Sequence, residues 1–460
     1  MMTNASSSAA VLKAEARGNA PRLGAEIKAL SVRDNYTNWY YVGRIWVIVA
    51  ATIAGAMWGH AALNEAGFGW GWHLPIALFA IVIIGASQHE LGGVLHEGTH
   101  YMLFANRRLN ELASDWLAGF PMYTSIHHYR LYHLAHHQFI NDPDRDPDLA
   151  QLRHSGHLLD FPVTHIEILV KILKQLWLPN LFRYTIGRVR NHSFDEQHNP
   201  YADPARKGSK WPLIVNVFFW LGVPAIVPPL IKFGYWEIAF VAIAAIWAAS
   251  VAYFALIPER AFPGSRLEPV ISHRATAISR VTFLFIVYTA LSAIDVYRGD
   301  PWGWRTFALY WIVPLFTTFP LFMILRHWVH HGNADRGRYT NTRVYLVNPF
   351  IRYAIFPFGF DYHLPHHVFA SVPHYRLKEL HELLLERDPQ YREKGVIVEG
   401  YFGHDNAVSG RPTAMSVLGA GHAPKGTEAA FLDSTVLEPA EVADRAGIER
   451  EVAASGRAAG

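Results

Sequence analysis

Several stretches of this chain run for about twenty residues with almost no charge, and this feature restricts its fold more than any other. Hydrophobic residues make up 51% of the 460 residues and charged residues only 17%, against roughly 25% charged in an ordinary soluble domain. A soluble chain of this length would need about three domains with alternating apolar and charged faces. The sequence therefore predicts an all-α, integral membrane helical bundle.

Six apolar segments stand out as candidate membrane-spanning helices. Several contain glycine and proline, which spanning helices tolerate. The weakest, 281–296 and one of the two before it, are open to a re-entrant or interfacial reading, so the prediction is four to six spans. The segments are 42–58, 74–87, 211–232, 236–257, 281–296 and 307–325.

Lysine and arginine are distributed unevenly between the connections. The connection 60–73 has none, whereas 101–210 has thirteen. Because positive residues are retained on the cytosolic side, we expect both termini and the long connections in the cytosol and place the protein in the cell inner membrane. Two stretches, 158–181 and 348–359, mix aromatic, aliphatic and basic residues as interfacial helices do, and would cover the cytosolic side.

Composition divides the chain into three parts. Residues 1–40 form a polar cytosolic segment, and 41–400 form the membrane domain with its histidine-rich cytosolic cap. Residues 405–460 contain one aromatic residue, Phe431, and are rich in Ala, Gly, Ser and Glu. Such a segment buries too little apolar surface to fold, so we expect a disordered tail.

The absence of cysteine excludes whole classes of chemistry. Disulfides, iron–sulfur clusters and thiolate nucleophiles are all ruled out for this chain. A net charge of +3 is too small to indicate a nucleic-acid partner. Any redox chemistry therefore depends on electrons from another molecule.

Histidine is abundant, and fourteen of the 26 histidines lie in four short clusters. HEGTH has the spacing i, i+4, and both HLAHH and HLPHH have i, i+3, i+4, so each set projects its imidazoles from one face of a helix. All four clusters fall on the side that the positive residues mark as cytosolic. The clusters are His89, His96 and His100; His127, His128, His133, His136 and His137; His327, His330 and His331; and His363, His366 and His367.

The number of convergent imidazoles points to the kind of metal centre. Neutral imidazole suits Zn, Fe, Cu and Ni, and a tetrahedral zinc needs only three or four ligands. Nine or more imidazoles therefore indicate two metal ions, with iron favoured. The run NDPDRDPD either orients ligand imidazoles through hydrogen bonds or forms a self-capping turn; its polar members are Asn141, Asp142, Asp144, Asp146 and Asp148.

Taken in order, HEGTH, YRLYHLAHH with NDPDRDPD, WVHHG and DYHLPHHVFASVPHYRLKELH resemble the membrane fatty acid desaturase superfamily over about residues 43–382. The resemblance implies histidine boxes that bind two Fe ions at the cytosolic face. The ligands it implies are His96, His100, His133, His136, His137, His331, His363, His366 and His367.

Six other residues near these motifs need separate interpretation. The family often has Glu before the extra histidine of the last helix, where this chain has His330, so His330 remains an alternative to His331 and His327 lies one turn earlier. We interpret His89 as an interfacial histidine bonded to a backbone carbonyl, and His127 and His128 as packing residues. Arg130 is expected to pair with the acidic run.

The resemblance implies O2-dependent desaturation of a fatty acyl chain, or hydroxylation or ketolation of another lipid such as an alkane, carotenoid or sterol. Electrons would come from a separate carrier of the ferredoxin or cytochrome b5 type. A basic stretch could dock an acidic carrier, although retention of positive charge in the cytosol also explains it. It comprises Arg183, Arg188, Arg190, Arg206, Lys207 and Lys210.

Two other classes of membrane protein compete with this interpretation. HEGTH matches the HExxH pattern of zinc proteases, in which Glu97 would be the general base, but this reading leaves the other clusters without a role. A metal-ion transporter would explain many histidines but not their repeated helical register, and would have ionisable residues at mid-membrane.

Overall fold

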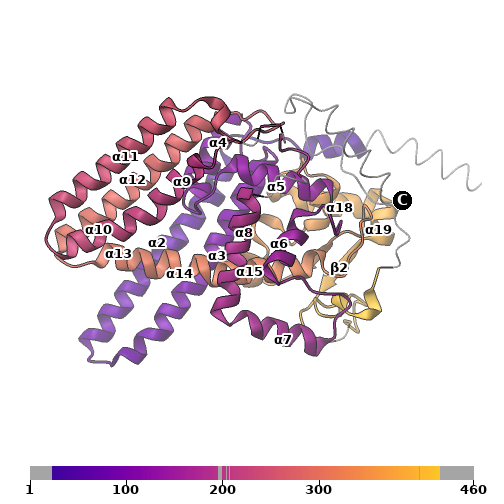
Figure 1. Ribbon diagram of the computed structural model, residues 1–460. Helices are drawn as coiled ribbons and strands as arrows, with labels where there is room; N and C mark the ends of the chain where they lie inside the picture. Colours follow the sequence, from indigo (N-terminus) through magenta and orange to yellow (C-terminus); the bar gives the residue numbers. More distant parts are fainter. Residues whose placement is uncertain (1–22, 195–198, 204, 207, 404, 425–460) are drawn as a thin grey trace, which may run out of the picture.

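The computed structural model describes residues 23–194, 199–203, 205–206, 208–403 and 405–424. Helices dominate this part of the chain, and the strands named in it form one parallel pair. Figure 1 shows long helices on one side and shorter helices with the strand pair on the other. The predicted all-α bundle is confirmed.

Six helical stretches are long and apolar enough to cross a membrane, which is the upper number predicted from the sequence. The segment expected to be weakest, around 281–296, lies in one uninterrupted helix of 26 residues. The six are α2 (Thr37–Glu65); η1 and α3 (Trp70–Trp72, His73–Thr99); α9, η3 and α10 (Trp211–Val217, Phe218–Gly222, Val223–Lys232); α11 (Trp236–Leu256); α12 (His273–Arg298); and α13, η5, α14 and α15 (Trp302–Phe307, Ala308–Ile312, Val313–Phe316, Thr318–His331).

The third and sixth spans each contain a π-helical turn followed by proline. Proline lacks an N–H and its ring clashes with the carbonyl four residues earlier in an α-helix. Pro224 follows η3 and Pro314 follows η5. Each π-helical turn therefore lies directly before a proline that a regular α-helix would accommodate poorly.

Helix α3 is the central element of the bundle. It packs along α2 on one side and contacts α5 (Ile126–Gln138), α15 and α16 (Pro349–Ile355) with the half that follows Ala80. Helices α10, α11 and α12 pack side by side as a separate group, visible beside the α2–α3 pair in Figure 1. The carboxyl-terminal end of α3 is therefore enclosed on several sides.

A cap of short helices connects the second and third spans. It consists of α4 (Arg107–Ser114), η2 (Asp115–Gly119), α5, α6 (Pro147–Ser155), α7 (His165–Gln175) and α8 (Leu178–Phe194). Thr164 and Glu167 form a reciprocal capping box at the start of α7. Ile166, Leu173 and Trp177 are exposed there, as an interfacial helix over 158–181 requires.

The chain after the sixth span forms a second part of the cap. Helix α16 and η6 (Pro357–Gly359) occupy the other expected interfacial stretch, with Phe350 exposed. The remaining elements are η4 (Glu259–Ala261) in the loop after α11, and β1 (Arg343–Leu346), α17 (His363–Val368), η7 (His374–Arg376), α18 (Leu377–Arg387), α19 (Pro389–Lys394), β2 (Val396–Glu399), η8 (Ser416–Leu418) and η9 (Ala420–His422). Strands β1 and β2 pair in parallel, with Arg343 opposite Val396.

Part of the expected tail is folded. Met415, Val417 and Leu418 are buried in a cluster with Trp328, and Asn333 donates hydrogen bonds to the Val417 and Gly419 carbonyls. Residues 411–422 therefore do not belong to a disordered tail, because a few of their apolar side chains pack against the rest of the fold. Residues 425–460 lie outside the described residues.

The end of the polar amino-terminal segment is also attached to the cap. Residues 23–30 are helical, and Ile27 is buried in a cluster with Leu377 and Leu380. The guanidinium of Arg376 donates to the carbonyl of Ala29 at 2.9 Å.

Candidate metal centre

Four distant stretches of the chain bring their histidines to one place. His96 lies in the last turn of α3, with His100 directly after that helix. The second box lies on α5, His331 ends α15, and the third box occupies α17. All nine histidines implied by the family resemblance meet in this buried region.

The first group contains five imidazoles from three of these stretches. The Nε2 atoms of His100 and His133 are 3.1 Å apart, and those of His137 and His366 are 3.2 Å apart. One ring nitrogen from each member lies within 4.8 Å of the others; the members are His96, His100, His133, His137 and His366. Ring nitrogens that point at a common centre at this spacing can bind one cation.

The second group adjoins the first and contains the other four imidazoles. His136, His331 and His367 bring ring nitrogens within 4.8 Å of one another. The Nε2 atom of His363 lies 3.2 Å from that of His331 and 3.0 Å from that of His367. Rings of the two groups also touch, since the centroids of His137 and His367 are 4.3 Å apart. The second group is therefore another set of buried, convergent ring nitrogens that could hold a metal ion.

The protonation state of six of these rings suits metal binding. Burial lowers the pKa of His100, His133, His137, His363 and His367, with help from neighbouring imidazoles, and lowers that of His366 to about 3. These rings are therefore neutral at pH 7, the form that ligates a metal. Among the described residues, neither of the buried ring nitrogens of His96, a member of the first group, has a hydrogen-bond partner. Such unpaired atoms are costly without a ligand.

The comparisons with known proteins agree with this geometry. The sequence signature of the fatty acid desaturase family matches residues 71–287 and 247–395, which together span 325 of the 460 residues. The chain belongs to the fatty acid desaturase family. Dihydrorhizobitoxine desaturase of Bradyrhizobium elkanii is 27% identical over 124 residues, or 27% of this chain and 32% of that protein. Delta(5) fatty acid desaturase fat-4 of Caenorhabditis elegans is 32% identical over 113 residues, or 25% of this chain and 23% of that protein.

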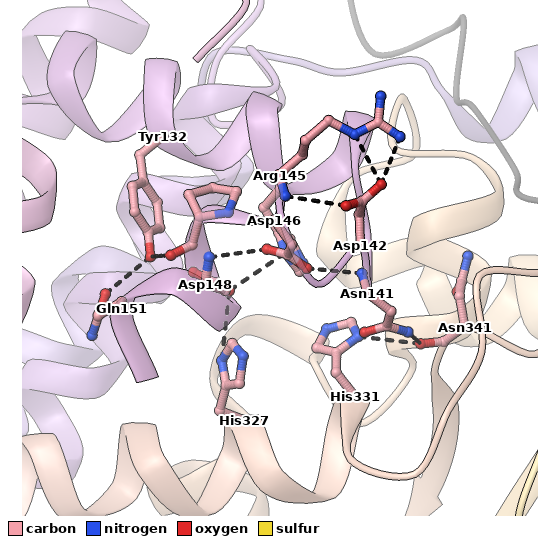
Figure 2. Close-up of polar contacts among 12 residues, drawn as sticks. Tyr132, Asn141, Asp142, Arg145, Asp146, Asp148, Gln151, His327, His331 and Asn341 are labelled. Carbon is pink, nitrogen blue, oxygen red and sulfur yellow. Dashed lines mark hydrogen bonds and ion pairs between the residues drawn. The ribbon is translucent and has the colours of Figure 1, made fainter. Parts of the chain in front are cut away.

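Two rings of this desaturase-family site are oriented by partners outside the two groups. His136 Nδ1 lies 2.9 Å from Asp146 Oδ1. His331 Nδ1 lies 3.2 Å from the Asn341 carbonyl (Figure 2). These contacts fix which nitrogen of each ring faces the metal region. Burial opposes a charge on His136, but the carboxylates of Asp146 and Asp148 raise its pKa to about 9.

The run NDPDRDPD makes both the imidazole contacts and the self-capping turn that the sequence left open. Asp146 holds His136 and also caps α6, since it accepts from the backbone N–H of Asp148. Asp142 accepts from the N–H groups of Asp144 and Arg145 and so forms the self-capping turn (Figure 2). One short acidic run therefore serves the fold and the site.

The histidines at the end of α15 take different positions. His331 belongs to the second group, whereas His330 stacks on His363 at 4.2 Å with the rings 16° from parallel. A nitrogen of His330 still lies within 4.8 Å of nitrogens of His331 and His363. His327 lies 3.5 Å from Asp148 and in none of the histidine groups among the described residues. The arrangement favours His331 as the extra ligand.

The other histidines lie outside the two groups, as expected. His89 Nδ1 is 2.8 Å from the Ala354 carbonyl, and His128 Nδ1 is 2.8 Å from Ser125 Oγ. His127 packs edge to face on His273.

The prediction for Arg130 is wrong. Its guanidinium pairs with Glu111 of α4, not with the acidic run, and donates to the carbonyls of Gly98 and Thr99. It therefore ties α5 and α4 to the end of α3. Sequence separation alone favoured the acidic run, but the fold places a buried carboxylate of an earlier helix beside it.

Two contacts that support the centre could not be predicted from the sequence. Glu97 Oε2 accepts the backbone N–H of His374 at 3.0 Å, which joins the first box to the loop after the third. His374 Nε2 lies 2.9 Å from Asn38 Oδ1. The same contact gives Glu97 a structural partner in place of the water that a protease's general base would activate.

Proposed function

We propose that this desaturase-family protein inserts a double bond into a fatty acyl chain at a di-iron centre, with O2 as oxidant and electrons from a separate carrier. The observation that carries the proposal is the pair of adjoining groups formed by nine buried imidazoles. A single tetrahedral zinc binds four ligands, so about half of these imidazoles would bind no metal. Imidazole sites without thiolate also suit iron.

The proposed roles follow from the contacts. The nine histidines would hold the ions, and Asp146 and the Asn341 carbonyl would keep the rings of His136 and His331 aimed at them. Two bound irons supply the activation of O2. The reaction balances as –CH2–CH2– + O2 + 2 electrons + 2 H+ → –CH=CH– + 2 H2O. Burial of the centre would keep bulk water from the reacting carbon.

The basic stretch contains both exposed and enclosed arginines. Arg183 and Arg206 of the basic stretch are exposed and could contact an acidic carrier of the ferredoxin or cytochrome b5 type. Arg188 lines an internal cavity instead, so it does not belong to such a docking surface. The side chains of Arg190 and Lys207 lie outside the described residues.

The proposed orientation places the centre at the cytosolic face of the inner membrane. Both α3 and α15 end at the histidine groups, and the connection 101–210 between the second and third spans contains thirteen of the 41 Lys and Arg residues. Reduced carriers of the cytosol would then reach the centre directly.

Metal analysis of the purified protein, with lipid analysis of an expressing host, tests the proposal. We expect about two irons per chain and lipids with a new double bond. Iron with hydroxylated or ketolated lipid would favour the alternative reaction on an alkane, carotenoid or sterol. Stoichiometric zinc with peptidase activity would overturn the proposal in favour of a metalloprotease.

A further inference from the structure

A polar cavity adjoins the histidine groups. A cavity of about 40 Å³ lies between side chains that include His96, His133 and His363 of the centre. The walls away from these rings carry Tyr132, Gln151 and Asp148, shown in Figure 2, together with two arginines. A purely hydrocarbon segment of a substrate would leave these polar groups without partners.

The two arginines are the main charges of the cavity. Arg188 comes from α8 and Arg326 from α15, one turn before His330. Arg188 lies against Met323 Sδ at 3.3 Å and over the ring of Phe319, and Arg326 lies over the ring of Phe360 at 4.8 Å. No carboxylate of a described residue lies within 4.0 Å of either guanidinium. Aromatic faces attract a cation but leave its charge uncompensated.

The one acidic wall residue is already engaged. Asp148 lies 3.5 Å from His136 Nδ1 and 3.5 Å from His327 Nδ1. Its carboxylate therefore lies nearer to these imidazoles than to either guanidinium, and both arginines line the same cavity. Charged residues within a membrane-spanning bundle mark a binding site for an opposite charge, and guanidinium matches carboxylate and phosphate geometry.

A larger and mainly apolar cavity lies beside the polar one. It has a volume of about 230 Å³ between α8, the third span, α12 and α14, and its walls include Val217, Leu284 and Leu315. Tyr184 and Arg188 line both cavities. A molecule that fills both would place an alkyl part in the larger cavity and a polar part beside the histidines.

This arrangement leads to an inference that rests on the proposed function and restricts the class of substrates. We infer that the substrate is an amphiphile whose anionic head, a carboxylate or a phosphate, is bound by Arg188 and Arg326 beside the metal centre. Its alkyl part occupies the apolar cavity. The oxidised carbon then lies within a few bonds of the head, and not in the middle of a long chain.

Arg280 is the alternative site for the head group. It lines the apolar cavity with His127 and His273. Its Nε donates to Asn216 Oδ1 at 3.1 Å, so this guanidinium already has a hydrogen-bond partner. Arg326 has no hydrogen-bond partner among the described residues, and its guanidinium lies over the ring of Phe360.

Binding of single-chain amphiphiles to the full-length protein in nanodiscs tests the inference without turnover. We expect dodecanoate or dodecyl phosphate to bind at least about 10-fold tighter than dodecanol, and the tighter of the two anions identifies the head group. Arg326→Gln and Arg188→Gln should each remove about 10-fold of the anion affinity and leave dodecanol binding unchanged, while Arg326→Lys retains part of it. Arg183→Gln, an exposed arginine of the same α8, is the matched control and should bind like the parent protein.

Metal content and melting temperature of each variant establish that it is folded. Equal affinity for anions and alcohol, a loss confined to Arg280→Gln, or inorganic phosphate binding as tightly as dodecyl phosphate would each overturn the inference. If the protein binds anions selectively and Arg326→Gln abolishes that selectivity, the inference about the head group is supported. If such a protein forms no oxidised lipid, this result counts against the proposed function alone.

Discussion

At the scale of single residues, the centre depends on which nitrogen each imidazole presents. A histidine that donates Nδ1–H to a carboxylate or carbonyl must offer Nε2 to the metal. His136 uses Asp146 in this way, and His331 uses the carbonyl of Asn341. Most other rings of the two groups contact chiefly one another, so their orientation comes from the helices that carry them.

Removal of a ligand tests the assignment directly. His136→Ala should lower activity at least about 100-fold and reduce the iron content, because it takes one imidazole from the second group. His422→Ala is the control, since His422 is partly exposed and pairs with Asp405. Elemental analysis and lipid product analysis measure both effects; full iron content and activity in His136→Ala would contradict the ligand assignment.

The role of the acidic run can be separated from its contribution to the turn. Asp146→Asn keeps an acceptor for capping α6 but removes the charge beside His136, so we expect about 10–100-fold weaker metal affinity. Asp144→Asn changes an exposed residue of the same run and should have little effect. Competition with a chelator gives the two affinities, and equal values would show that Asp146 is only a cap.

At the scale of elements, α3 holds the first histidine box against its neighbours through close packing. A Cβ atom on Gly85 would lie 2.0 Å from Thr318 Oγ1 and 2.9 Å from the backbone nitrogen of Phe319. Thr318 Oγ1 in turn donates to the Ile81 carbonyl at 2.8 Å. Glycine therefore lets α15 start directly against α3, and the two helices carry their histidines to the same end.

A side chain at this contact should separate the helices. Gly85→Leu is expected to destabilise the protein by about 1–3 kcal/mol or more through overpacking and to reduce metal content. Gly55→Leu on α2 is the matched control, because a Cβ there meets nothing within 4 Å. The melting temperature in detergent measures the difference in stability. Equal melting temperatures for the two variants would show that the α3–α15 contact accommodates a side chain without loss of stability.

At the scale of the whole molecule, the centre lies where two spanning helices end and both parts of the cap meet. Helix α5 comes from the connection after the second span, and α17 follows the sixth. Their boxes meet the ends of α3 and α15, so spans and cap are needed together. Loops on the far side, such as the turn between α2 and α3, take no part.

The proposed orientation can be measured in a chain that has no natural cysteine. Ala66→Cys in the α2–α3 turn should react with an impermeant thiol reagent added outside the inner membrane. Lys174→Cys on α7 should react only after the membrane is opened. Both positions are exposed in the fold, so reactivity reports the side of the membrane. The reverse pattern would place the centre outside the cytosol.

The sequence by itself determined the spans and the register of the boxes. Charge-free segments must be helical in a bilayer, since their backbone hydrogen bonds have to be made within the segment. The i, i+3, i+4 spacing places His133, His136 and His137 on one helix face wherever that helix lies. These properties are local, so one sequence suffices to predict them.

Only the tertiary structure decided how the boxes divide into two groups and what surrounds them. His136 and His137 are adjacent in the chain, yet they belong to different groups, because His137 meets the first box at the end of α3 and His136 meets His331 and His367. The pairing of Arg130 with Glu111 and the two arginines of the polar cavity likewise depend on contacts between helices distant in sequence. Spacing along one helix fixes a direction, but a distance between helices is set by the packing of all their side chains.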